Sequence, residues 1–289
     1  MLKAAIKGII ISCAISSGAF AQEVFKLNSF GGGFNVMLGY QGYNPSSYFS
    51  DKTGIGDELT GIRTSGNLVT TSTATFNKPS SGVLNMGFQG FGVFNSFMLG
   101  GELNFNLGTP SESEHKEETF ENGVLVSSAN KTYKTTSRLA GADVLVNLGF
   151  VALRKRGLIV YPMVGFGYGM SGLLLSSDAP NRLYPGIASV VTESDPNLQN
   201  IFIWTRTPMF DFGLGAQYML GASTEDRAKG FSVGLRMGYK LQPQSNTILV
   251  NANKNVADGL SDEDKKLVPN VGLSGFYVKL LIGFGKIGE

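Results

Sequence analysis

The chain has 289 residues and a net charge of +2, and 16% of its residues are charged, 39 are glycine and 20 are phenylalanine. This charge content is low for a water-soluble domain, whereas the glycine and aromatic contents are high. The basic residues form no stripe, so the composition argues against nucleic acid as a partner.

Residues 1–21 have the pattern of a secretory signal peptide, with two early lysines, a mostly apolar stretch and a final Ala-Phe-Ala cleavage motif. Cleavage would remove both lysines, which leaves no net charge. It would also remove Cys13, the only cysteine, so the mature chain could form no disulfide. We predict a signal peptide over 1–21 and one exported domain over 22–289.

Downstream segments alternate apolar side chains with small or polar ones, which is the period of a β-strand. For example, Phe231, Val233 and Leu235 are separated by serine and glycine. About ten residues suffice for a tilted strand to cross a bilayer. Strands are predicted over Phe30–Gly42, Gly82–Phe94, Phe97–Gly108, Ser137–Val151, Leu158–Leu174, Ile201–Leu220, Phe231–Gln242 and Val271–Gly285.

The connections between these strands alternate strictly between long and short. An outer-membrane barrel has this asymmetry, with long loops outside the cell and short turns in the periplasm. We therefore predict an all-β fold, an eight-stranded antiparallel up-and-down transmembrane β-barrel with both termini in the periplasm. The long connections cover 43–81, 109–136, 176–200 and 243–269.

Some of these segments carry signals of their own. Asn122-Gly123 predicts a tight turn, so the strands on either side of 109–136 would continue outward as a projecting hairpin. Leu59–Arg63 and Leu68–Phe76 could form a further hairpin, which would give ten strands. Within 201–220, Pro208 predicts a bulge or kink.

The composition of the two strand faces predicts which one contacts lipid. The polar face is mainly Gly, Asn, Gln and Ser, which suits a narrow lumen filled by side chains, whereas a soluble lipocalin-like barrel carries charge outside. Aromatic residues near the strand ends on the apolar face resemble the girdles of membrane barrels. The predicted girdle consists of Phe94, Phe97, Phe202, Trp204, Tyr218, Phe231, Tyr239 and Phe284.

Charged residues on the polar face would lie in the lumen, where an unpaired charge is costly to bury. Arg236 is predicted to be the central cation, paired with Asp211 and with either Glu102 or Asp143 across the lumen. We interpret the set as a structural plug, with a charged gate or proton path as the alternative. The predicted network consists of Glu102, Asp143, Asp211, Arg236, Lys240 and Lys279.

No catalytic, cofactor or metal site is predicted. His115, the only histidine, is expected to be a solvated loop residue without the neighbours that a hydrolase or a metal requires. Asp262-Glu263-Asp264 lacks a calcium-loop pattern and is expected to begin a short helix. The glycines at 165, 167 and 169 are expected to make room for large neighbours such as Met163, Tyr277 and Lys279.

By pattern rather than by strict motif, residues 30–285 resemble the small outer-membrane barrels of the OmpA/OmpX/OmpW type. The last strand, from Phe276 to Phe284, is similar to the terminal signal read by the barrel-assembly machinery, although five residues follow it. Nothing in the sequence resembles a peptidoglycan-binding domain. The resemblance implies a bacterial outer-membrane location, with outer-membrane lipid, lipopolysaccharide and the assembly machinery as partners.

Three functions are compatible with these patterns. The favoured one is a non-enzymatic structural or surface-interaction role through the long extracellular loops, whose ligand the sequence does not identify. A narrow channel or small-solute carrier is the alternative. A lipid-modifying barrel enzyme is disfavoured, because the lone histidine lacks a nucleophile and an orienting acid nearby.

Overall fold

The computed structural model describes residues 30–42, 61–75, 82–177, 200–220, 227–243, 249–250, 254–255 and 272–288. The predicted signal peptide and the acidic cluster from Asp262 to Asp264 lie outside these ranges. Within them, the structure contains no helix with the length and apolar character needed to span a membrane.

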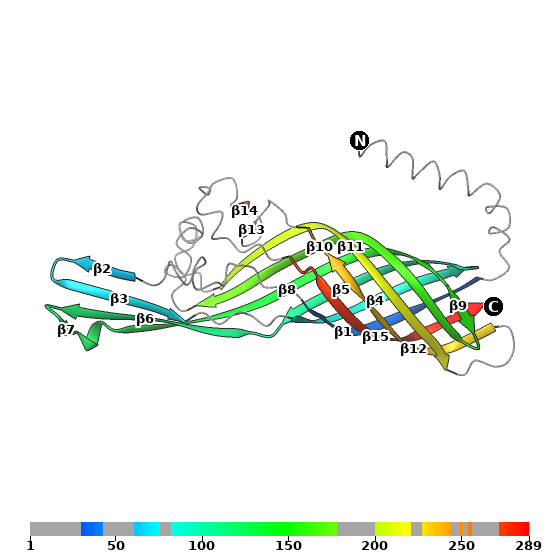
Figure 1. Ribbon diagram of the computed structural model, residues 1–289, viewed down its shortest axis with the longest axis horizontal. Helices are drawn as coiled ribbons and strands as arrows, with labels where there is room; N and C mark the ends of the chain where they lie inside the picture. The colour runs from blue at the N-terminus through cyan, green and yellow to red at the C-terminus, as the bar shows by residue number, and fades with distance from the viewer. Residues whose placement is uncertain are drawn as a thin grey trace.

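Eight long strands close into an antiparallel barrel (Figure 1). Each pairs with the next along the chain, and the last pairs with the first, which places Phe34 opposite Phe284. The eight-stranded prediction is confirmed, and the ten-stranded alternative is wrong. The barrel strands are β1 (Phe30–Gly42), β4 (Gly82–Phe94), β5 (Phe97–Gly108), β8 (Lys131–Phe150), β10 (Leu158–Ser177), β11 (Asn200–Leu220), β12 (Arg227–Leu241) and β15 (Gly275–Gly288).

The sheet continues outward from the long-loop end of the barrel (Figure 1). Residues 131–137 of β8 pair with β6 (Ser111–Glu121), which pairs with β3 (Leu68–Thr75), which pairs with β2 (Gly61–Ser65). We call these four segments the projecting sheet. The extra hairpin anticipated before Gly82 does form, but its strands join the projecting sheet instead of the barrel.

Short elements complete the described structure. The remaining elements are β7 (Val124–Leu125), the 3-10 helix η2 (Ser127–Ala129), β9 (Leu153–Lys155), β13 (Leu249–Val250) and β14 (Lys254–Asn255).

Two-residue turns form the hairpins β6–β7 and β9–β10. Asn122 and Gly123 have φ angles of 50° and 81°, and Arg156 and Gly157 have the same two values. Positive φ at both central residues is the geometry that joins twisted antiparallel strands best, and Asn and Gly tolerate it. The tight turn predicted at Asn122-Gly123 is confirmed.

Burial alternates along the barrel strands as the sequence predicted. In β5 every second residue is buried, from Met98 to Gly108, and the residues between them are exposed. Leu235 and Phe212 point outward and are 45% and 52% exposed, whereas the buried positions carry Asn, Gln, Ser and charged residues as well as apolar ones such as Leu281. The apolar face is therefore the outside of the barrel, as in a membrane protein, and the polar face lines the lumen.

Aromatic pairs mark the two ends of this apolar surface. Phe97 contacts Phe150 and Phe231 contacts Phe284 at the short-turn end, with ring centroids 5.9 and 5.3 Å apart. Tyr239, paired with a phenylalanine at 5.0 Å, lies toward the other end. Along a tilted strand, the eight residue steps from Phe231 to Tyr239 span about 20 Å of height, close to the apolar band of such barrels.

The other predicted girdle residues also lie on outward positions near strand ends. Phe94 and Tyr218 are exposed at the short-turn end, and Phe202 stacks on Trp204 at 6.4 Å at the long-loop end.

The bulge predicted at Pro208 is wrong. The pairing of β10 with β11 runs without interruption from Leu158 opposite Tyr218 to Ser176 opposite Asn200, and Pro208 lies opposite Tyr168. On its other side, β11 pairs with β12 only from Phe210 onward. Pro208 is therefore tolerated because it lies beyond the end of the β11–β12 ladder, where β12 requires no backbone N–H from it.

Candidate functional site

The six charged residues of the predicted network all point into the lumen. They come from five strands, and each is at most 3% exposed. Three are acidic and three are basic, so the set is neutral as a whole. The strands bring them together as Glu102 on β5, Asp143 on β8, Asp211 on β11, Arg236 and Lys240 on β12, and Lys279 on β15.

Glu102 joins two of the cations. Nη2 of Arg236 donates to Oε2 of Glu102, and Nζ of Lys279 donates to Oε1. Nδ2 of Asn147 also donates to Oε2, at 3.0 Å. Both carboxylate oxygens are therefore occupied, which satisfies a fully buried charge.

Asp143 and Lys240 form the second cluster. Nζ of Lys240 lies 2.7 and 2.9 Å from the two carboxylate oxygens of Asp143. The amides of Asn104 and Asn106 donate to the same oxygens, at 2.6 and 3.1 Å. Oδ1 of Asn104 in turn accepts from Lys279 at 2.8 Å, so Asn104 connects the two clusters.

Asp211 is held less directly. Its Oδ1 accepts a hydrogen bond from the hydroxyl of Tyr277 at 2.7 Å, and its Oδ2 lies 3.7 Å from Nη2 of Arg236. The ring of Tyr277 also lies beneath both neighbouring cations, 5.6 Å from Cζ of Arg236 and 5.0 Å from Nζ of Lys279. Tyr277 thus touches three members of the network.

Sequence reasoning did not assign Tyr277 this role. A Cβ added at Gly213 or at Gly238 would lie 2.7 Å from the Tyr277 hydroxyl, so the two glycines leave the space that the hydroxyl occupies. A tyrosine between Gly275 and Lys279 on the inward face of the last strand was the available signal. It becomes specific only when the strand register places it beside those glycines.

The structure places Arg236 between Glu102 and Asp211, while Asp143 pairs with Lys240. Glu102 and Asp143 lie on adjacent strands, and each has its own lysine, which offsets their mutual repulsion.

The prediction of which side chains occupy the space beside the glycines of β10 is wrong. Gly165 faces Asn147 and Asp211, and Gly169 faces Met209, in place of Met163, Tyr277 and Lys279.

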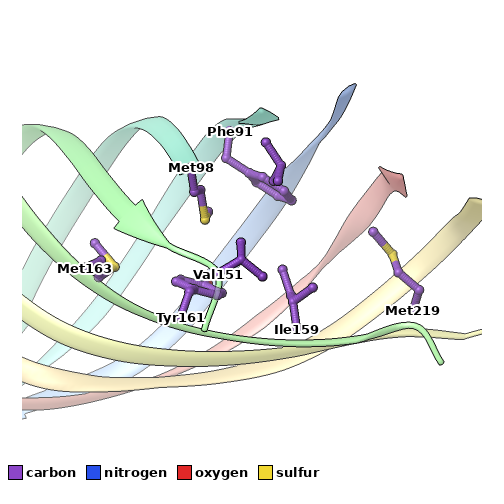
Figure 2. Close-up of a cluster of buried hydrophobic side chains, with 8 residues drawn as sticks. Phe91, Met98, Val151, Ile159, Tyr161, Met163 and Met219 are labelled. Atoms are coloured by element: carbon purple, nitrogen blue, oxygen red, sulfur yellow. The ribbon is translucent and has the colours of Figure 1, made fainter. Parts of the chain in front are cut away.

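A buried apolar cluster fills the lumen near the short turns, and Figure 2 shows its side chains gathered between the strands. The sequence did not predict this cluster, because its residues lie on the strand face that was predicted to be polar. Ile159, for example, lies between two apolar neighbours, which hides the alternation. The cluster consists of Phe91, Val93, Met98, Val151, Ile159, Tyr161, Met163 and Met219.

A third layer occupies the opposite end of the lumen. Leu273, just before β15, is 2% exposed, and its backbone N–H donates to Oε1 of Gln242 at 2.9 Å. Its carbonyl accepts a hydrogen bond from Nε2 of Gln41, and Ser171 donates to Gln242 at 3.2 Å. The lumen therefore holds the apolar cluster at the short turns, the charged network in the middle and these amide and hydroxyl contacts at the long-loop end. A further amide group, Asn35, Gln89 and Gln217, lies on the short-turn side of the charged network.

The projecting sheet carries a groove of about 560 Å³ on one face. Hydroxyl groups, one carboxylate and one ammonium group supply its polar atoms. Its lining residues are Ser65, Leu68, Thr70, Glu117, Thr119, Ala129 and Lys131.

The prediction of a solvated His115 is wrong. His115 lies on β6, is 3% exposed, and has its ring centroid 5.7 Å from that of Tyr133. The segment from Ser111 to Glu121 alternates buried and exposed residues, so it is a two-faced strand and His115 is on the covered face. Among the described residues, no group of three or more His, Cys, Asp or Glu side chains could hold a metal ion.

No protein-family model and no curated protein matches the chain. Among solved structures, Ail of Yersinia pestis in complex with the heparin analogue sucrose octasulfate has a TM-score of 0.32 and 11% identity, covering 89% of this chain and 97% of that one. OprG from Pseudomonas aeruginosa has a TM-score of 0.29 and 13% identity, covering 90% and 96%. The outer-membrane protease OmpT from Escherichia coli has a TM-score of 0.29 and 6% identity, covering 91% and 98%.

These similarities are too weak to transfer any activity. The assignment rests on the closed strand pairing, the apolar exterior and the polar lumen of the chain itself. These features of the chain are those of an eight-stranded outer-membrane β-barrel.

Proposed function

We propose that this barrel is a non-enzymatic, non-conducting protein of the bacterial outer membrane that holds the projecting sheet outside the cell to bind extracellular ligands. The predicted signal peptide would deliver it to the assembly machinery. The observation that carries the proposal is the continuity of β8, which runs from the barrel wall through residues 131–137 into the projecting sheet.

The packing of the lumen supports a role other than conduction. Glu102, Arg236 and Lys279 connect opposite walls of the barrel by buried ion pairs. Toward the short turns, the apolar cluster lies in the same lumen. An aqueous path would require both layers to open, and an eight-stranded barrel has little room to rearrange them.

The far end of the projecting sheet supports a binding role. Val124, Leu125 and Leu68 are 69%, 43% and 42% exposed there, and we call these three residues the tip. The backbone N–H of Asn122 donates to the carbonyl of Asn67 at 3.2 Å, which ties the two turns of the tip together. Val124 and Leu125 are consecutive strand residues, so the tip exposes apolar side chains on both of its faces. Exposed apolar side chains on an extracellular element are typical of contact surfaces.

Adhesion of whole cells tests the proposal. Cells producing the wild-type protein are expected to attach, above vector-only cells, to at least one plate coating among fibronectin, laminin, collagen and heparin. The triple variant Leu68→Ser, Val124→Ser, Leu125→Ser is expected to lose this attachment. Leu153→Ser is the matched control, because Leu153 is 47% exposed beside a short turn at the other end of the barrel.

The proposal fails if wild-type cells attach to none of these coatings, or if the tip variant attaches as well as wild type at equal surface amounts. Single-channel recording in planar bilayers tests the channel alternative separately. Reproducible conductance by the wild-type protein would favour the channel over the proposed closed barrel.

A further inference from the structure

The outer surface of the barrel changes character sharply at the long-loop end. From residue 140 to 150 of β8, and from 208 to 220 of β11, no outward-pointing side chain is charged. The next outward residue on each strand is an arginine, Arg138 on β8 and Arg206 on β11. On β11 the outward residues after Arg206 are Trp204 and Phe202 of the aromatic girdle, so both arginines lie at the outer edge of the apolar band, at the level of lipid headgroups.

The two arginines belong to one patch. Strand β10 separates them, with Leu174 opposite Arg138 and Met170 opposite Arg206. Strand spacing and rise put their Cα atoms about 16 Å apart, across two inter-strand steps and four residues along the strand. Leu174 and Met170 are both exposed, so an apolar surface lies between the two arginines.

Both guanidinium groups have uncharged neighbours among the described residues. Nε of Arg138 donates to the carbonyl oxygen of Gly108 at 2.9 Å. Cζ of Arg206 lies 6.0 Å from the ring centroid of Trp204. Neither arginine forms an ion pair with a carboxylate in the part of the chain that the structure describes.

Arginine in this setting is suited to phosphate, because its planar group forms two parallel hydrogen bonds to phosphate oxygens. The adjoining apolar surface, with Met170 and Tyr168 both exposed below the arginines, is suited to acyl chains. A ligand that offers both chemistries is a phosphorylated lipid whose headgroup lies at the long-loop end.

We propose that Arg138 and Arg206 form a binding site for the phosphate groups of lipopolysaccharide in the outer leaflet, with its acyl chains against Met170 and Tyr168. The inference rests on the orientation that puts the long loops outside the cell, and it is independent of adhesion by the tip. The headgroup of lipopolysaccharide is a phosphorylated disaccharide, which can extend from one arginine to the other, whereas a phospholipid has one small phosphate.

Trp204 reports on this site directly, because it is the only tryptophan and lies beside Arg206. Folded protein in micelles of an uncharged detergent is titrated with bisphosphorylated lipid A while Trp204 emission is followed. Saturable binding is expected. The double variant Arg138→Gln, Arg206→Gln is expected to bind about tenfold more weakly or worse, because two charged phosphate contacts are lost. Lys286→Gln is the control and should leave binding unchanged, because it removes an exposed cation on β15 at the short-turn end of the barrel.

Two further ligands distinguish the sources of phosphate. Dephosphorylated lipid A should bind the wild type about as weakly as lipid A binds the double variant. Phosphatidylglycerol should bind the wild type more weakly than lipid A. Equal binding of lipid A by the folded double variant and the wild type would overturn the proposal, and so would equal affinity for phosphatidylglycerol. The Arg206→Gln single variant provides the same comparison if the double variant does not fold.

Discussion

Replacing Arg236 by methionine tests the buried network most directly, since methionine keeps much of the side-chain volume and removes the charge. Arg236 is fully buried, contacts Glu102, and lies 3.7 Å from Asp211. Without it the lumen carries one uncompensated negative charge. Asp211 then retains only the hydrogen bond from Tyr277 among its described polar contacts.

Removing one partner of a fully buried ion pair typically destabilises a protein by roughly 3–5 kcal/mol. Glu102 keeps its contacts with Lys279 and Asn147 in the variant, which favours the lower end of that range. We therefore expect Arg236→Met to lower the free energy of unfolding by about 3 kcal/mol. No conductance is expected, because the apolar cluster still fills the lumen toward the short turns.

Urea unfolding in lipid vesicles, followed by Trp204 fluorescence, measures the loss. The double variant Arg236→Met, Asp211→Asn restores a neutral lumen and should be about 1–2 kcal/mol more stable than Arg236→Met alone, although it carries one substitution more. Lys254→Ala, on β14, is the control and should unfold like wild type. An unchanged stability of Arg236→Met, or a double variant less stable than the single one, would refute this account of the network.

Three other outcomes follow from the same structure. Leu235→Arg is expected to lower the free energy of unfolding by roughly 2–4 kcal/mol, since it puts a cation on the lipid-facing side of the apolar band; a neutral effect in the same urea assay would mean that the faces are reversed. Cysteine introduced at Val124 should react with an impermeant thiol reagent on intact cells, and cysteine at Lys155 should not, whereas the reverse pattern would invert the topology. Glu102→Gln should destabilise the protein more than Asp211→Asn in urea unfolding, because Glu102 binds two cations and Asp211 lies 3.7 Å from one; equal losses would contradict that ranking.

The barrel could be predicted from the sequence because two independent signals agree on it. Alternating side chains defined Gly82–Phe94 and Phe97–Gly108 with the bounds that the structure has, and loop lengths defined the topology. The outward continuation of β8 before Ser137 was weaker, since residues 131–136 are almost all polar and their two faces look alike. The alternation of side chains does not indicate which strand the β2–β3 hairpin pairs with, because its partner β6 is distant in the sequence.

The inward position of the six charges also followed from alternation, but their pairing did not. Whether Arg236 meets Glu102 or Asp143 depends on the stagger and tilt of strands on opposite sides of the lumen, which a single sequence does not encode locally. The apolar cluster was missed for a different reason. Next to the short turns, inward residues such as Ile159 and Met219 have apolar neighbours on both sides, so the two faces cannot be told apart by composition.

The same strand that closes the lumen also supports the projecting sheet. Asp143 of β8 is bonded to Lys240 across the barrel, and the same backbone continues outward to pair with β6. The base of the projecting sheet is therefore fixed to a wall held by buried ion pairs, unlike a loop that is anchored only at its ends. A ligand that binds such a preformed surface orders fewer residues on association, so more of the contact energy appears as affinity. In the proposed binding role, a closed, packed lumen would contribute to affinity by holding β8, and with it the base of the projecting sheet, in place.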